Sequence, residues 1–141
     1  MSSVRVSQQL DYALRAVVDL ARRPHGSPVP AGEIAESLGL PRRFVEQQIT
    51  VLARSGIVAC RRGTGGGCTL ARDAADVTVL DVVRAIDGDV LDVPLAPASA
   101  TAELWASAAH ALETHLGRTT VADLARRQDD LDAVGREMYF I

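Results

Sequence analysis

A glycine-rich segment at residues 57–70 constrains the fold of this chain more than any other part of the sequence. It reads IVACRRGTGGGCTL, with two short apolar stretches around two arginines and a run rich in glycine. Glycines let the backbone turn sharply, so the segment predicts a β-hairpin with a flexible, cationic tip. An apolar-periodic helix precedes it and ends at Gly56. A helix followed by a basic hairpin is typical of a winged helix-turn-helix, which binds DNA.

Two shorter segments before the hairpin predict the helix-turn-helix itself. A first helix is expected over residues 31–38, the sequence Leu-Gly-Leu-Pro then forms a turn, and the next helix runs from Arg42 to Ser55. Two helices joined by a tight turn that contains glycine form this motif. Upstream, residues 8–23 have helical apolar spacing and Ser7 is placed to cap their N-terminus.

The polar residues of the helix over 42–55 are candidates for reading DNA bases. Its apolar stripe consists of Val45, Ile49 and Leu52. The side chains away from that stripe concentrate towards the N-terminal end and are Arg42, Arg43, Glu46, Gln47 and Thr50. Arginine can donate twice to guanine, glutamine can pair with adenine, and glutamate can accept from the cytosine amino group. The alternative interpretation is an ordinary solvated helix face.

The hairpin tip completes the candidate DNA-binding set with Arg61, Arg62 and Gly63. Glycine allows the backbone to approach a duplex closely, and narrow A·T-rich minor grooves attract arginine. Glycine-rich loops also bind phosphate, but those loops lead into a helix or carry a Lys-Ser/Thr pair. A strand follows here, so nucleotide binding is not expected.

Charge is distributed unevenly along the chain, although the formal net charge of the 141 residues is only -3. Residues 1–72 hold 10 arginines against 5 acidic residues, whereas residues 73–141 hold 5 arginines against 13. This asymmetry favours a basic binding module joined to an acidic body, with chance clustering as the alternative. No signal-peptide pattern or bilayer-length apolar run occurs in the sequence, so we expect a cytoplasmic protein without membrane contact.

The C-terminal half predicts further helices and an assembly role. Thr78 is placed to cap a helix over residues 79–87, and residues 88–101 are expected to form a loop. The helix expected over 103–116 has a wide apolar arc, which favours a dimerisation helix over an ordinary core helix of a monomer. A short helix over 121–127 and a polar run should follow.

These predictions combine into a mainly α fold with a small β-hairpin. Residues 1–88 are expected to form the winged helix-turn-helix DNA-binding domain. Residues 89–141 are expected to form an effector loop and a dimerisation helix region.

Five segments in order resemble one known family. They are LDYALRAVVDLA, AGEIAESLGLPRRFVEQQITVLARSGIV, RRGTGGGCTLAR, TVLDVVRAIDG and TTVADLA. Together they resemble the bacterial Rrf2 family of winged-helix regulators, which includes iron-sulfur-cluster-responsive and nitric-oxide-responsive repressors. The resemblance implies a homodimeric transcription regulator, usually a repressor, that binds a pseudo-palindromic operator on double-stranded DNA. It also implies that Glu46 and Gln47 form the recognition pair, that Arg43 lies in the preceding base-reading turn, and that Arg62 and Gly63 form the wing Arg-Gly pair.

The sequence also departs from the pattern of that family. Cluster-binding members have three cysteines in the loop before the long helix, whereas residues 88–103 here contain none. Because iron-sulfur clusters are held mainly by cysteine thiolates, we expect a cluster-independent regulator with no cofactor and no metal. Cys68 stands where the family usually has an aromatic residue, and Gln48 replaces an apolar residue. The first departure concerns how the hairpin packs, and the second concerns the register of the helix over 42–55.

The signal that such a regulator senses has two candidates, a small-molecule effector and a thiol switch. If the hairpin turns about Thr64, Cys60 and Cys68 lie directly opposite each other at a spacing that a disulfide can bridge. The second function considered is therefore a redox-sensing repressor that uses these two thiols. Against it, the cytosol is reducing and cysteine often packs simply as a small hydrophobic residue.

An enzyme is not expected. The chain has three histidines, at positions 25, 110 and 115, and no serine or cysteine nucleophile has an evident base and orienting partner. The two histidines of the predicted helix over 103–116 are five residues apart, which is not the i, i+4 spacing that places two ligands on one face.

Overall fold

The computed structural model describes residues 5–93 and 98–139. Its elements, in chain order, are α1 (Gln8–Arg22), α2 (Ala31–Leu38), α3 (Arg42–Arg54), β1 (Val58–Arg61), β2 (Gly67–Leu70), the 3-10 helix η1 (Ala74–Asp76), α4 (Val79–Ile86), α5 (Ala100–Arg118) and α6 (Val121–Tyr139). The strands pair antiparallel into one hairpin, which confirms a mainly helical fold with a small β-hairpin. No helix within the described ranges is long and apolar enough to cross a bilayer.

Helix α1 lies at the centre of the N-terminal part of the molecule. Its side of small residues, including Ala13, Ala16 and Val17, is fully buried. Small side chains let neighbouring helices approach closely, and α1 packs against α2, α3, α4 and α6. Ser7 caps the helix as predicted, because its hydroxyl accepts a hydrogen bond from the Leu10 N–H at 3.1 Å.

The core around α1 consists mainly of aliphatic side chains, as expected for a chain with 4% aromatic residues. The largest fully buried side chains come from α1, α2, α3, α4 and α6 and from the residues just before β1 and α4, and they are Ile34, Leu52, Ile57, Val17, Val45, Val77, Val82 and Val121. One buried carboxylate joins α1 to α2. Asp19 accepts from the Arg23 Nε at 2.8 Å and from the Ser37 hydroxyl at 3.1 Å.

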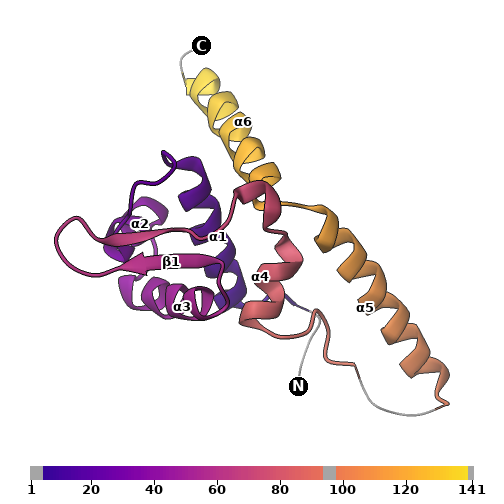
Figure 1. The fold of residues 1–141 in the computed structure, drawn as a ribbon. Helices are drawn as coiled ribbons and strands as arrows, with labels where there is room; N and C mark the ends of the chain where they lie inside the picture. The colour runs from indigo at the N-terminus through magenta and orange to yellow at the C-terminus, as the bar shows by residue number, and fades with distance from the viewer. Residues whose placement is uncertain (1–4, 94–97, 140–141) are drawn as a thin grey trace.

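The starts of α4 and α6 lie side by side and are joined by backbone hydrogen bonds. The Val79 N–H donates to the Thr119 carbonyl at 2.9 Å, and the Val121 N–H donates to the Val77 carbonyl at 2.8 Å. This bridge therefore fixes α6 to the core at the point where α4 begins. Helix α5 begins away from this region and leads back to it just before α6 starts (Figure 1).

The same side-chain motif starts both helices. Thr78 forms a reciprocal capping box with Asp81, as the sequence predicted for α4. The Thr120 hydroxyl accepts from the Asp123 N–H and the Asp123 carboxylate accepts from the Thr120 N–H, both at 3.0 Å. Hydrogen bonds from the backbone and side chain of Thr120 lower the pKa of the Asp123 carboxyl.

The boundaries predicted for α5 are too narrow. The helix begins at Ala100 and ends at Arg118, because Ser99 caps it by accepting from the Ala102 N–H at 3.4 Å. The expected loop over 88–101 is therefore shorter at its C-terminal end than predicted. Residues 94–97 of that loop lie outside the described residues.

The prediction of a short helix over 121–127 followed by a polar run is wrong, because α6 continues to Tyr139. Its polar residues are held by charge pairs. Arg22 of α1 donates to Asp129 at 2.8 Å and also pairs with Asp132. Gln128 donates to Asp132 one turn along the helix, and the hydrogen bonds from Gln128 and Arg22 lower the pKa of that carboxyl. Tertiary charge pairing with α1 thus supports a helix that shows little apolar periodicity.

Candidate nucleic-acid interface

The turn between α2 and α3 has the geometry that a helix-turn-helix requires. Gly39 adopts a left-handed conformation with φ of 65°, which ends α2. The Gly39 N–H donates to the Glu36 carbonyl at 3.2 Å, and the Leu40 N–H donates to the Ala35 carbonyl at 2.9 Å. Pro41 then precedes the first residue of α3. These bonds satisfy the end of α2 and fix the direction in which α3 begins.

Helix α3 buries the stripe that its sequence predicts. Val45, Ile49 and Leu52 are buried, and Gln48 is only 5% exposed. The glutamine thus occupies the buried face without changing the helix register. The predicted base-reading residues are all exposed, namely Arg42, Arg43, Glu46, Gln47 and Thr50. Their exposure agrees with the predicted face, and their contact with DNA stays a prediction.

Three of these residues are linked to one another on the helix surface. The Arg42 Nε donates to Glu46 Oε1 at 2.7 Å, and the Thr50 hydroxyl donates to the Glu46 backbone carbonyl at 2.9 Å. Side-chain exposure is 73% for Arg42 and 49% for Glu46. Exposed ion pairs contribute only about 0–1 kcal/mol, so a DNA base can replace Arg42 as the partner of Glu46 at small cost.

The hairpin forms with the predicted register. Its cross-strand partners include Cys60 opposite Cys68 and Arg61 opposite Gly67. At the tip, the Gly66 N–H donates to the Gly63 carbonyl at 2.9 Å. Arg61, Arg62 and Gly63 are exposed there. We refer to residues 58–70 as the wing.

The base of the wing is joined to the segment between α1 and α2. Val29 and Cys68 exchange two backbone hydrogen bonds, of 2.9 and 2.8 Å. Gly67 lies so close to this segment that a Cβ there would come within 2.5 Å of the Val29 carbonyl carbon. Cys68 itself is 5% exposed. The small Cys68 thiol is therefore buried at the base of the wing, where the backbone bonds to Val29 hold the strand in place.

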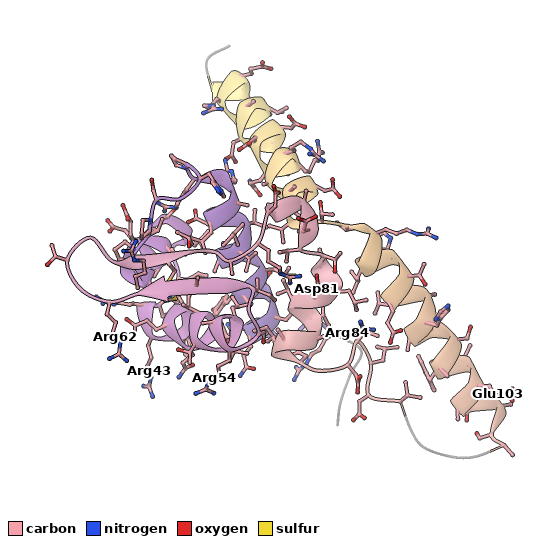
Figure 2. The ribbon with its side chains drawn as sticks, viewed as in Figure 1. Arg43, Arg54, Arg62, Asp81, Arg84 and Glu103 are labelled. Carbon is pink, nitrogen blue, oxygen red and sulfur yellow. The ribbon has the colours of Figure 1, made fainter. Side chains whose placement is uncertain are left out.

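The interface brings arginines from two elements to one side of the molecule. Arg43 and Arg54 of α3 and Arg62 of the wing point in the same direction (Figure 2). Within the described residues, none of the three has a carboxylate partner. Three cations without local neutralisation on one face form a surface suited to a phosphate backbone.

Sequence reasoning missed Arg54. It lies in the last turn of α3, where a basic residue is also expected simply for its interaction with the helix dipole. The available signal was its spacing, since Arg43, Gln47, Thr50 and Arg54 recur at intervals of four, three and four along the helix. Such spacing places all four on one side of an α-helix.

The other candidate residues do not form a metal centre. Among residues 5–93 and 98–139, no group of three or more His, Cys, Asp or Glu side chains is arranged to hold a metal ion. Both cysteines of the sequence, Cys60 and Cys68, lie in the wing, where their sulfurs face each other at 2.6 Å. The thiolate set that an iron-sulfur cluster requires does not fit these residues.

Comparison with known proteins identifies the family. A family model described as "Rrf2: Iron-dependent Transcriptional regulator" matches residues 6–127. The chain belongs to the Rrf2 family. Its members are transcriptional regulators, not enzymes, in agreement with the sequence prediction.

Individual relatives extend over nearly the whole chain. An HTH-type transcriptional regulator of Mycobacterium tuberculosis is 32% identical over 131 residues, which cover 86% of this chain and 81% of the relative. The solved structure of CymR, the global cysteine regulator of B. subtilis, is 29% identical, with a TM-score of 0.78, and the match covers 87% of this chain and 97% of CymR. The structure of T. potens IscR is 33% identical, with a TM-score of 0.77 and 90% of each chain covered. These neighbours confirm the winged-helix fold class.

Proposed function

We propose that this Rrf2-family regulator is a homodimeric repressor that binds a pseudo-palindromic operator without an iron-sulfur cluster. The observation that carries the proposal is the convergence of Arg43, Arg54 and Arg62 on one side of the molecule (Figure 2). A recognition helix and a wing that present cations in the same direction can contact adjacent grooves of one duplex.

The exposed residues of α3 have distinct roles in this proposal. Arg43, Glu46 and Gln47 contact base edges in the major groove, where their donors and acceptors distinguish base pairs. Arg42 orients the Glu46 carboxylate through a 2.7 Å hydrogen bond until a base takes its place. Thr50 lies on the same exposed face, and its hydroxyl donates to the Glu46 backbone carbonyl at 2.9 Å. Arg54 contacts the phosphate backbone at the other end of the helix.

The wing contacts the minor groove. Arg62 enters the groove, Arg61 contacts phosphate, and Gly63 allows the backbone to approach the duplex. The bonds between Val29 and Cys68 fix the base of the wing during this contact.

Exposed apolar side chains on α5 and α6 support the homodimer. On α5, Leu104, Trp105 and Leu112 are 61%, 41% and 36% exposed, and Ala109 is its one buried residue in the described chain. On α6, Leu131 and Val134 are 46% and 54% exposed. Helix α5 and the C-terminal part of α6 extend away from the N-terminal part of the molecule (Figure 1). A second copy offers the same apolar faces and thus a self-complementary cover for them.

The positions of the two cysteines support a regulator that works without an iron-sulfur cluster. The description of the family model names iron dependence, but both thiols of this chain belong to the wing and not to a loop before α5. We expect operator affinity to stay unchanged after treatment with a strong iron chelator. A chelator-dependent loss of affinity would contradict this part of the proposal.

The DNA-binding experiment uses a duplex selected by the protein from a random pool, with affinity measured by fluorescence anisotropy. Arg62→Ala should weaken binding and reduce the preference for A·T-rich sequence, whereas Glu46→Ala should change base preference by roughly 1–3 kcal/mol per affected contact. Arg54→Ala should lower the salt slope by about 1, as expected for one lost phosphate contact. Arg84→Ala is the matched control, since this exposed arginine of α4 lies away from the other three (Figure 2). Equal losses in Arg62→Ala and Arg84→Ala would contradict the assigned interface.

Assembly and direction of regulation need separate measurements. Sedimentation equilibrium should give a dimer for the full chain and a shift towards monomer for Leu112→Glu, with half-sites in the selected DNA about one helical turn, or a multiple, apart. A reporter gene under a promoter that overlaps the selected sequence should decrease in expression when the protein is present. A monomeric wild-type chain would contradict the proposed homodimer. Increased reporter expression would contradict the proposed repression.

A further inference from the structure

The two cysteines of the wing occupy the cross-strand position at which side chains come closest. The Cys68 N–H donates to the Val29 carbonyl, and the Cys68 carbonyl accepts from the Val29 N–H. Both bonds lie on the side of β2 that faces away from β1. Cys60 and Cys68 are therefore a non-hydrogen-bonded pair of the hairpin, the type with a Cα separation of about 4.5 Å. Disulfides bridge Cα separations of roughly 4.4–6.8 Å, so this pair is within range.

The side chains are also oriented for a bond. The two Sγ atoms lie 2.6 Å apart. Oxidation therefore joins two side chains that already face each other across the strands. Because the strands are already in register, the backbone of the wing keeps its conformation when the bond forms.

The two thiols differ in access. Cys60 is exposed, whereas Cys68 is buried against the segment that contains Val29. Burial raises the pKa of the Cys68 thiol to about 12, with a further contribution from its hydrogen bond with Cys60. Cys60 is therefore the sulfur that an oxidant in solution can reach, and Cys68 is the sulfur placed behind it.

We propose that the wing is a dithiol switch, in which a hydroperoxide oxidises Cys60 and Cys68 to an intramolecular disulfide and thereby increases DNA affinity. The inference deepens the proposed function and rests on it, since the wing is taken to bind the minor groove. Nothing in the hairpin pairing requires a second chain or a metal ion.

The reaction balances in two steps. The Cys60 thiolate attacks the hydroperoxide, a sulfur-oxygen bond forms, the O–O bond breaks, and the departing alkoxide or hydroxide takes up the proton that the Cys60 thiol released, giving an alcohol or water. The Cys68 sulfur then attacks the sulfenic acid on Cys60, so that an S–S bond forms and hydroxide leaves, which takes the Cys68 proton to give water. Overall, two thiols are oxidised, one hydroperoxide is reduced, and a dithiol reductant reverses the change.

The direction of the effect follows from the flexibility of the tip. Three glycines with positive φ, Gly63, Gly65 and Gly67, lie between the cysteines, so the reduced tip has large conformational freedom. A disulfide at its base prevents the strands from separating and leaves Arg61 and Arg62 in place. Less freedom is then lost when the tip enters a groove, and affinity rises.

The first test establishes the bond. The reduced full chain is treated with hydrogen peroxide and analysed by intact mass spectrometry and maleimide labelling. We expect a monomer-mass species that has lost two hydrogens and has no free thiol, and we expect Cys60→Ser and Cys68→Ala each to retain one labelled or singly oxidised cysteine. Peroxide treatment that leaves both thiols free, or that links two chains through Cys60, overturns the proposal.

The second test measures affinity for a duplex selected from a random pool. The oxidised wild-type chain should bind about three- to tenfold more tightly than the reduced chain, because the tip is ordered before binding. Reduction should reverse the gain, and Cys60→Ser should show none. Equal or weaker binding by the oxidised chain, or the same gain in Cys60→Ser, overturns the proposal. If neither the reduced nor the oxidised chain binds any duplex, the proposed function fails, while the mass measurement still decides whether the disulfide forms.

Discussion

Gly67 offers the sharpest test of how the wing is held to the rest of the fold. A Cβ at this position would lie 2.5 Å from the Val29 carbonyl carbon, 2.7 Å from its nitrogen and 2.8 Å from the Pro30 nitrogen, all of them backbone atoms. The φ of Gly67 is +145°, which L side chains rarely adopt. In Gly67→Ala the strand must therefore move away from this segment.

The expected loss can be estimated from the bonds that this movement breaks. Two backbone hydrogen bonds join Val29 and Cys68, and each contributes about 1 kcal/mol. Backbone strain adds about 2 kcal/mol. We therefore expect Gly67→Ala to lower the free energy of unfolding by roughly 3–4 kcal/mol. Gly65→Ala is the matched control, because Gly65 has φ of +75° with nothing within 4 Å of its Cβ position, and it should lose only about 1 kcal/mol.

The measurement is urea unfolding followed by far-UV circular dichroism at one fixed protein concentration, since association of subunits adds to apparent stability. The unfolding midpoint should decrease far more for Gly67→Ala than for Gly65→Ala, with the slope unchanged. Equal shifts in the two variants would show that the contact with Val29 does not hold the wing.

Four further predictions concern the cap of α6, the core and the two thiols. Thr120→Ala removes one half of the capping box with Asp123 and should cost about 1 kcal/mol of unfolding free energy, seen as a lower urea midpoint. Leu52→Ala, at a fully buried position, should cost roughly 2–5 kcal/mol in the same assay. Iodoacetamide near pH 8 should label Cys60 in the reduced folded chain and leave Cys68 unlabelled until urea is added, as read by peptide mass spectrometry. Burial raises the pKa of Cys68 to about 12, whereas the thiol in the unfolded chain has a pKa of about 8.5. The contribution of the neutral thiol to the free energy of unfolding is therefore complete below about pH 8.5 and is lost as the pH rises towards 12. A free energy of unfolding that stays constant across this range would contradict the burial of Cys68.

The helix-turn-helix and the wing were predictable because their signals are local. Gly39, Pro41 and the glycines of the hairpin determine turns through their own backbone preferences, and the apolar stripe of α3 determines which face is buried. The opposition of Cys60 and Cys68 followed from counting residues on either side of Thr64, and the register confirms it.

The C-terminal helix was less predictable because its support is not local. The run after residue 127 is mostly polar, and its apolar residues Leu131, Val134 and Met138 are exposed. Asp129 and Asp132 find their partner in Arg22 of α1, about a hundred residues away along the chain. Sequence spacing carries no information about such a pair. The pairing of Arg42 with Glu46 is different, because its i, i+4 spacing on one helix is a local signal that sequence alone can supply.

The backbone bridge between the starts of α4 and α6 has a consequence for how such a regulator can change over evolution. Both ends of the segment that includes α5 are pinned beside one another by the Val79–Thr119 and Val121–Val77 bonds. This segment begins with α4, whose Val79, Val82 and Val83 belong to the core, so an insertion, a deletion or a replacement confined to α5 leaves the spacing of α3 and the wing untouched. Doubling the length of a flexible loop costs only about 0.6 kcal/mol, so this part of the chain can change in length with little loss of stability. New sensing or assembly functions can be acquired there while the DNA-facing half keeps its geometry.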